Sequence, residues 1–269
     1  MITSLNVNNF LGRKEWNELL GNIEEKERIW EKNREYLFSY IKSHINRDDD
    51  LVILHEVPYV YETGYNYRGQ LKYKRSNVRC QIYLQLLEFC KSENLSILYP
   101  DTVEVSYFRT IAICCEKKYS NINSGVVFDE YKNRILVLKN NVSGNKQAVV
   151  GIHAPSTGNI DKYWESLKEL YRHLELQDYR NKIFIGDFNV YLPGTRQKKL
   201  FFELLSEGLV DLWIEKGNSH KDATFEKGTR IDYALVSHGI YNEFEIYKDD
   251  DIRKDGYSDH SAVIIISNK

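Results

Sequence analysis

Short apolar runs alternate along this chain with longer amphipathic segments. Runs such as 51–54 and 183–186 are apolar throughout and rich in β-branched residues, which is typical of strands buried on both faces. Together with runs that alternate apolar and polar positions, they predict strands at residues 2–7, 51–54, 103–108, 110–116, 134–139, 146–153, 183–186, 222–226, 231–236, 240–247 and 261–267.

The amphipathic segments carry apolar residues three or four positions apart. This spacing predicts helices over residues 14–43, 76–91, 159–177 and 196–206, and Gly21 is a point at which the first could divide in two. No internal repeat, low-complexity tract or linker separates these elements. The sequence therefore predicts one α/β domain over residues 1–269.

Composition and charge limit the kinds of partner that this chain is expected to bind. The 269 residues carry a formal net charge of −2, so there is no global basic field that would attract nucleic acid without specificity. No apolar run approaches the roughly 20 residues of a membrane span, and the start lacks the pattern of a signal peptide. The cysteines show no C-x-x-C spacing, and Cys114 and Cys115 would face opposite sides of a strand. We expect a cytoplasmic protein with reduced thiols and no membrane span.

Polar residues stand where the apolar runs stop. The early strands run into such residues, whereas near the C-terminus the polar residues precede the strands; in chain order they are Asn6, Glu56, His153, Asp187, Asn189, Asp232, Asp259 and His260. If the late strands run antiparallel to the early ones, all these side chains lie along one edge. Carboxylates gathered in this way repel one another unless a cation is bound, and oxygen-rich ligands suit Mg²⁺ or Mn²⁺.

Each of these residues except His260 also has a purely structural interpretation. Asn6 could form a strand-to-loop turn, and the pair Asp187 and Asn189 could form an Asx turn. Glu56 could be a solvated loop acid, and His153 a half-buried histidine. Arg230 with Asp232 could be a structural ion pair, and Ser258 with Asp259 a local cap. Their shared position at strand ends argues against accepting all these interpretations at once.

Five ordered motifs also resemble those of a known superfamily. They are Ser4-Leu-Asn6-Val, Leu54-His-Glu56-Val, Ile185-Gly-Asp187-Phe-Asn189, Arg230-Ile-Asp232-Tyr and Tyr257-Ser-Asp259-His260-Ser. In this order they resemble the endonuclease/exonuclease/phosphatase superfamily. The resemblance implies a four-layer α/β sandwich, with two central, mainly antiparallel sheets flanked by helices, and metal-dependent hydrolysis of phosphoric esters.

The resemblance also implies roles for the oxygen-bearing residues. Glu56 would be the principal Mg²⁺ ligand, with Asn6 beside it and Asp259 near the metal. Asp187 and Asn189 would orient the attacking water and the phosphate. Mn²⁺ could substitute for Mg²⁺.

The histidines and one arginine complete this expected site. His260 would be the general base or would position the phosphate, and Asp232 would accept a hydrogen bond from its other ring nitrogen. A histidine at position 153 resembles the deoxyribonuclease I branch and could protonate the leaving oxygen or bind a phosphate oxygen. Arg109 resembles a phosphate-contacting arginine of that branch. The opening motif of exonuclease III is missing, so the resemblance does not imply a dedicated base-excision role.

The substrate depends on a basic and aromatic segment before the second predicted helix. Its tyrosines interleave with Arg68, Lys72, Lys74, Arg75 and Arg79. This composition suits a polynucleotide substrate, although a solvated basic loop has the same composition. Three hypotheses follow: a nuclease acting on DNA or RNA, a hydrolase of a small phosphoester such as a nucleotide, a phosphoinositide or a phospholipid head group, and a non-catalytic binding module.

Overall fold

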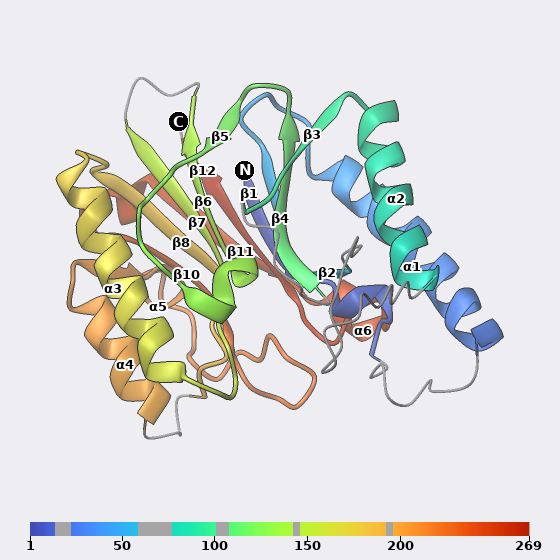
Figure 1. The fold of residues 1–269 in the computed structure, drawn as a ribbon. Coiled ribbons are helices and arrows are strands. Elements are labelled where there is room, and N and C mark those ends of the chain that lie inside the picture. Colours follow the sequence, from blue (N-terminus) through green and yellow to red (C-terminus); the bar gives the residue numbers. More distant parts are fainter. Residues whose placement is uncertain (14–22, 59–76, 101–107, 142–145, 192–195, 269) are drawn as a thin grey trace, which may run out of the picture.

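Two six-stranded sheets pack face to face in the computed structural model, with helices on both outer faces (Figure 1). The structure describes residues 1–13, 23–58, 77–100, 108–141, 146–191 and 196–268. Ile53 of one sheet and Ile185 of the other belong to the apolar layer between the sheets. Further apolar layers lie between each sheet and its helices. The four-layer α/β sandwich expected from the sequence is confirmed.

The first sheet has the strand order β11-β12-β1-β2-β4-β3. Its strands are β1 (Ile2–Asn6), β2 (Leu51–Pro58), β3 (Leu95–Leu98), β4 (Phe108–Cys115), β11 (Phe244–Asp249) and β12 (Ala262–Ser267). Strands β1 and β2 are parallel, and the other neighbours are antiparallel. Cys114 is buried and Cys115 is partly exposed, as expected for adjacent residues of a strand.

The second sheet repeats this arrangement with the order β5-β6-β7-β8-β10-β9. Its strands are β5 (Tyr119–Asn121), β6 (Ile135–Asn140), β7 (Gln147–His153), β8 (Asn181–Asp187), β9 (Leu209–Asp211) and β10 (Asp232–Ser237). Here β7 and β8 form the parallel pair. A long helix joins the parallel strands in each sheet, as the crossover between parallel neighbours requires. The two sheets thus share a topology that the sequence does not reveal as a repeat.

The helices form the outer layers. Helices α1 (Ile23–Ser43) and α2 (Asn77–Ser92) cover the first sheet, and α3 (Ile160–Leu176) and α4 (Arg196–Leu205) cover the second (Figure 1). The shorter elements are α5 (Leu212–Glu215), α6 (Asp251–Lys254) and the 3₁₀ helices η1 (Asn8–Phe10), η3 (Asp129–Arg134) and η4 (His238–Glu243). No described helix is both long enough and apolar enough to span a bilayer.

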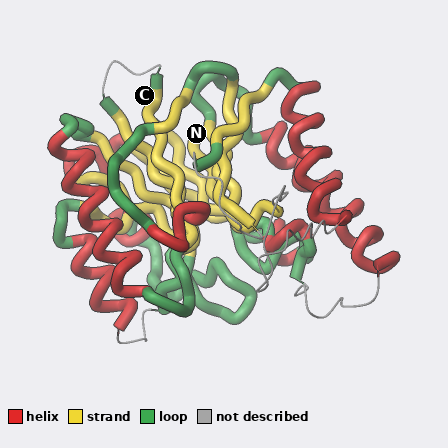
Figure 2. The backbone as a smooth tube through the Cα atoms, in the orientation of Figure 1, coloured by secondary structure: helices red, strands yellow, loops and turns green. Residues whose placement is uncertain are grey.

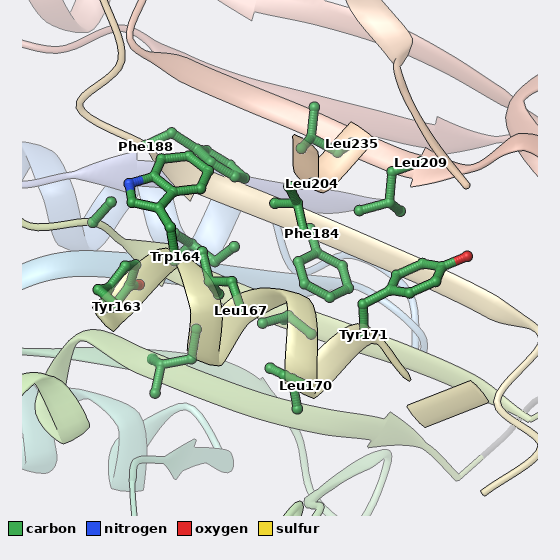
Figure 3. Close-up of a cluster of buried hydrophobic side chains, with 14 of the residues drawn as sticks. Tyr163, Trp164, Leu167, Leu170, Tyr171, Phe184, Phe188, Leu204, Leu209 and Leu235 are labelled. Carbon is green, nitrogen blue, oxygen red and sulfur yellow. The ribbon is translucent and has the colours of Figure 1, made fainter. Parts of the chain in front are cut away.

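Helix α3 illustrates how the amphipathic pattern produces the core. Trp164, Leu167 and Tyr171 lie on its buried side and pack toward Phe184 and Phe188 of the second sheet and the loop after it (Figure 3). The ring centroids of Trp164 and Phe188 are 6.1 Å apart. Burial of this apolar face, rather than intrinsic helix propensity, supplies most of the helix's stability.

Most predicted elements form, and the exceptions have a pattern. The unpredicted strands β3, β5 and β9 are short and lie at sheet edges, where the apolar signal of a strand is weak. The prediction of a strand at 222–226 is wrong: Phe225 makes an isolated bridge to His260, and the segment around it is a turn. The strand predicted from residue 240 begins at Phe244, after η4. Residues 14–22 and 101–107 lie outside the described part of the chain.

Candidate active site at one end of the sandwich

The polar strand ends meet at one end of the sandwich, opposite the end where both termini lie (Figures 1 and 2). The parallel strands β7 and β8 place His153 beside Asp187, and antiparallel β10 places Asp232 on the other side of Asp187. In the first sheet β1 ends at Asn6, beside the start of antiparallel β12. The arrangement expected from the sequence, with late strands antiparallel to early ones, is therefore present.

Asn6 connects the two sheets. Its Nδ2 atom donates to Oδ2 of Asp187 over 3.1 Å and to Oε1 of Glu56 over 3.3 Å. Its Oδ1 atom accepts the backbone N–H of Asn8 over 2.9 Å, which is an Asx turn. Asn6 thus forms the turn of the structural interpretation and contacts the carboxylates as well.

A bulge in β2 aims Glu56 at this cluster. The register with β4 shifts between Leu54 and Val57, and Glu56 has a φ of +55°. Such left-handed backbone is costly for a glutamate and is held in place by its surroundings. The bulge re-aims the side chain, so that Glu56 reaches Asn6 rather than following the regular alternation of the strand.

The Asp187 side chain forms an Asx turn and also contacts Asn6 across the candidate site. Its Oδ1 atom accepts the backbone N–H of Asn189 over 2.9 Å, while Oδ2 faces Asn6. Strand β8 ends at Asp187, and Asn189 has a φ of +51°, so the backbone is no longer extended at Asn189. The Asn189 amide instead donates to the carbonyl of Ala154 over 2.8 Å. The turn fixes both side chains at the edge of the site.

His260 and Asp232 form a buried hydrogen-bonded pair. The Nδ1 atom of His260 lies 3.0 Å from Oδ2 of Asp232, and its Nε2 atom points toward Asp187 Oδ2 at 3.9 Å and Asp259 Oδ1 at 4.0 Å. The Asp232 backbone N–H donates to the hydroxyl of Thr224. This geometry fixes the orientation of the imidazole and leaves Nε2 facing the carboxylates.

The electrostatics follow from burial. Removal from water, helped by the charge of Glu56, raises the pKa of Asp187 to about 7 and that of Asp259 to about 6. Burial alone would lower the pKa of His260, but the surrounding carboxylates, led by Asp232, outweigh it and raise this pKa to about 10. The negative charge of the carboxylates therefore exceeds the positive charge in the site, and protonated His260 balances part of it.

His153 has a different environment. Its Nε2 atom lies 3.4 Å from Oε1 of Glu56 and 3.3 Å from Nη1 of Arg134. Burial and the Arg134 cation lower the pKa of His153 well below its ordinary value, so this imidazole is neutral. Phe108 lies beside the ring, with centroids 5.3 Å apart, and the Arg134 guanidinium stacks over Phe108.

Arg109 lies in a separate environment. Its side chain is buried, its guanidinium donates to the hydroxyl of Tyr83 on α2, and it stacks over the rings of Tyr83 and Tyr99. The neighbouring Thr110 instead hydrogen-bonds His55 between the sheets. Contact between Arg109 and a phosphate stays a prediction.

Comparison with solved structures identifies the architecture. No protein-family model matches the sequence, and no curated protein does. Solved structures do match along the whole chain. An AP endonuclease from Archaeoglobus fulgidus gives a TM-score of 0.64 at 16% identity, covering 100% of this chain and 99% of that one. The chain has the endonuclease/exonuclease/phosphatase fold.

Two further structures support this assignment of the fold. The 3′ phosphatase NExo from Neisseria, bound to a product DNA hairpin, gives a TM-score of 0.60 at 15% identity, with 100% and 99% of the two chains covered. An endonuclease/exonuclease/phosphatase family protein from Leptotrichia buccalis gives 0.60 at 16% identity, with 100% and 99% covered. The superfamily resemblance read from the motifs is thus confirmed at the level of the fold.

Within this fold, the oxygen-rich part of the site fits a divalent cation. The charge of Glu56 helps to raise the pKa of both Asp187 and Asp259, and a bound cation would relieve this repulsion. Asp187, Asp232 and His260 also have ligand atoms within 4.8 Å of one another. A cation there would compete with the His260–Asp232 hydrogen bond for the Asp232 carboxylate, so we favour Glu56 and Asp259 as the residues that would hold it. Asn6 donates to Glu56 and Asp187, and its role as a direct ligand stays a prediction.

Several site residues were not predicted from the sequence. Arg134 reaches His153 from η3, and nothing in the surrounding sequence marks it. Asn9 donates to Glu56 from η1. His55 is fully buried and hydrogen-bonds Ser4 and Thr110, and its ring packs against Gly186. Of these, only His55 carried a signal, because it immediately precedes Glu56 in the motif.

Proposed function

We propose that this chain is a divalent-metal-dependent phosphodiesterase that hydrolyses phosphodiester bonds of DNA or RNA by in-line attack of water. The observation that carries the proposal is the buried His260–Asp232 pair, whose free ring nitrogen faces the carboxylates of Asp187 and Asp259. An oriented imidazole beside a cluster of carboxylates combines proton handling with a cation site.

In the proposed reaction Glu56 and Asp259, with Asn6 beside them, would hold Mg²⁺ or Mn²⁺. The cation supplies charge neutralisation for the phosphate. Asp187 accepts a hydrogen bond from the attacking water, and the Asn189 carboxamide, fixed by its bond to Ala154, orients a phosphate oxygen. This is positioning and electrostatic stabilisation, so no covalent enzyme intermediate is expected.

His260 serves either as the general base or as the group that positions the phosphate. Its raised pKa makes it a cation at neutral pH, which favours hydrogen bonding to a phosphate oxygen. Asp187 and Asp259 contribute to that raised pKa, and Asp259 would also hold the cation. A bound cation would balance part of this charge, and an unprotonated His260 could then accept the proton of the attacking water.

His153 and Arg134 act together on the phosphate. The Arg134 guanidinium can only donate, so Nε2 of a neutral His153 accepts from it. The lowered pKa therefore argues against protonation of the leaving group by His153 and favours a role in positioning Arg134. Arg134 stands beside it as a cation able to contact phosphate oxygens. We therefore assign to Arg134 the phosphate contact that sequence reasoning assigned to Arg109.

A polynucleotide substrate is supported by one of the structural neighbours, which is bound to a product DNA hairpin. The basic and aromatic segment with Arg68, Lys72, Lys74 and Arg75 supports it by composition, although residues 59–76 lie outside the described part of the chain. The test is to incubate the purified protein with plasmid DNA, single-stranded DNA and RNA, with Mg²⁺ or Mn²⁺ and with chelator. Intact polynucleotide under all conditions would refute the proposal.

The alternative is the same chemistry on a small phosphoester, which the net charge of −2 favours because the chain lacks a global basic field. Replacing Lys72, Lys74 and Arg75 by glutamine separates the two. A nuclease should become slower and less sensitive to salt, whereas turnover of a small phosphoester should barely change. A non-catalytic binding module would show neither turnover nor any effect of divalent metal on thermal stability.

A further inference from the structure

Directly after β1 the chain makes a tight left-handed turn. Asn8, Asn9 and Phe10 have φ values of +41°, +53° and +62°. Asparagine tolerates this region better than most residues, which explains two of the three positions. A run of such residues is costly, and its surroundings must hold it in place.

Contacts on the far side of the turn hold it. The Phe10 side chain is fully buried, and the Asn33 amide from α1 donates to the Phe10 carbonyl over 2.9 Å. The Asn8 amide donates to the carbonyl of Gly12 over 2.8 Å. None of these contacts involves Glu56, so the turn has its own anchors and presents Asn9 from a fixed position.

Asn9 meets the other strained residue of this region. Its Nδ2 atom donates to Oε2 of Glu56 over 3.2 Å, while Asn6 donates to Oε1 of the same carboxylate over 3.3 Å. Each oxygen of Glu56 therefore accepts one amide, and both amides come from the segment at the end of β1. Two donors on opposite oxygens fix the rotation of the carboxylate, which one donor alone would not do.

The Oδ1 atom of Asn9 is evidence that a ligand binds beside it. Asn9 is 7% exposed, and its Oδ1 atom is buried without a hydrogen-bond partner among the residues that the structure describes. A buried acceptor without a donor costs free energy, and buried acceptors are normally satisfied by protein or by ordered water. A water held at the neighbouring cation site would supply the missing donor.

We infer that Asn9 is a positioning residue for the cation site: it orients the Glu56 carboxylate through Nδ2 and accepts a hydrogen bond from a cation-bound water through Oδ1. This inference rests on the proposed function, because it assumes that Glu56 holds a divalent cation. Asn9 lies outside the five motifs, and it would be one of the residues that orient the metal-binding side chains by hydrogen bonds. Such outer partners commonly change metal affinity by about 10- to 100-fold.

The test compares Asn9→Gly with Asn8→Gly by calorimetric titration of the metal-free proteins with MgCl₂. Glycine accepts positive φ, so each variant removes one amide while keeping the turn. Asn8 is the matched control, because its amide bonds Gly12 rather than Glu56. We expect the dissociation constant for Mg²⁺ to rise about tenfold or more in Asn9→Gly and to stay within about twofold in Asn8→Gly.

Turnover provides the second measurement. In Asn9→Gly the Mg²⁺ concentration for half-maximal activity should rise, whereas kcat at saturating Mg²⁺ should recover, because the residue orients a ligand and does not touch the reacting atoms. Unchanged Mg²⁺ affinity in Asn9→Gly would overturn the inference while leaving the proposed function in place. A wild-type protein that binds no Mg²⁺ would overturn both.

A second variant tests the inference independently of Asn9→Gly. Asn9→Asp keeps the size and the tolerance of positive φ but sets a carboxylate against Glu56 in the metal-free protein. We expect its Tm without metal to fall and the rise in Tm on adding Mg²⁺ to exceed that of the wild type. An equal rise in the two proteins would contradict a position beside the cation.

Discussion

His260 Nδ1 lies 3.0 Å from Oδ2 of Asp232, and this contact joins the two sheets, because His260 precedes β12 of the first sheet and Asp232 begins β10 of the second. The contact of Asn6 with Asp187 crosses the same boundary. The site therefore exists only when both sheets are packed together. Its geometry depends on their relative placement rather than on any single loop.

The first prediction concerns the role of Asp232. Asp232→Asn removes the negative charge that orients and stabilises the protonated His260, so the pKa of His260 should fall from about 10. Turnover should fall by about 10²–10⁴-fold, the range for loss of a well-placed proton-transfer group. NMR titration of the imidazole in the metal-free protein measures the pKa. The control is Asp178→Asn, because Asp178 lies in an exposed ion pair with Arg180. An unchanged titration of His260 in Asp232→Asn would contradict the role assigned to Asp232.

The raised pKa of His260 also predicts how stability depends on pH. The pKa is about 10 in the folded state, above the ordinary histidine value of 6.5. The stabilisation is therefore fully present below about pH 6.5 and is lost as the pH rises through 10. We expect the free energy of unfolding of the metal-free wild type, relative to His260→Gln, to decrease over this interval. Urea denaturation at several pH values measures the difference, and a constant difference would show that His260 is not held protonated.

The third prediction concerns the strand end that carries Asp187. A Cβ on Gly186 would lie 2.0 Å from the Ile152 carbonyl oxygen and 2.8 Å from Nε2 of His55, in backbone with a φ of +146°. Gly186→Ala should therefore destabilise the protein by about 2 kcal/mol or more. Gly239→Ala is the control, because its Cβ would meet nothing within 4 Å; it should change stability by less than about 0.5 kcal/mol. Equal midpoints in urea for the two variants would contradict the close approach.

The fourth prediction tests the packing of α3. Leu174 is fully buried against the second sheet, and Leu176, two positions later, is 86% exposed. Leu174→Ala should cost about 2–5 kcal/mol, through lost burial and the cavity it leaves. Leu176→Ala should change stability by less than about 0.5 kcal/mol. Chemical denaturation of both variants measures the contrast, and similar losses would mean that the helix is rotated relative to the sheet.

The sequence predicts the framework and the strand-end residues because both depend on local pattern. Buried strands such as 183–186 need continuous apolar residues, and the change to polar side chains at Asp187 marks where the strand leaves the core. Edge strands such as β3 bury less, so their pattern is weaker. The turns at Asn6 and Asp187 do not exclude a place in the candidate site, because each side chain uses one oxygen for its turn and a second polar atom for the contact between the two residues.

Arg134 and Asn9 could not be predicted from the sequence, because only tertiary packing places them beside the other residues of the candidate site. Arg134 arrives from η3 and Asn9 from a left-handed turn, and neither element has a periodic signal. No local feature distinguished Arg109, which packs against Tyr83, from Arg134, which reaches His153. The direction of a side chain at a strand end depends on bulges such as the one at Glu56, and these become visible only when the partner strand is in place.

The most direct test of the central claim is cleavage of plasmid DNA, single-stranded DNA and RNA by wild-type protein and by His260→Ala, with Mg²⁺ and with chelator. We predict cleavage by the wild type with Mg²⁺, none with chelator, and a loss of at least about 100-fold in His260→Ala while its fold is retained. Cleavage that persists at the wild-type rate in His260→Ala, or intact polynucleotide in every reaction of the wild type, would contradict the account.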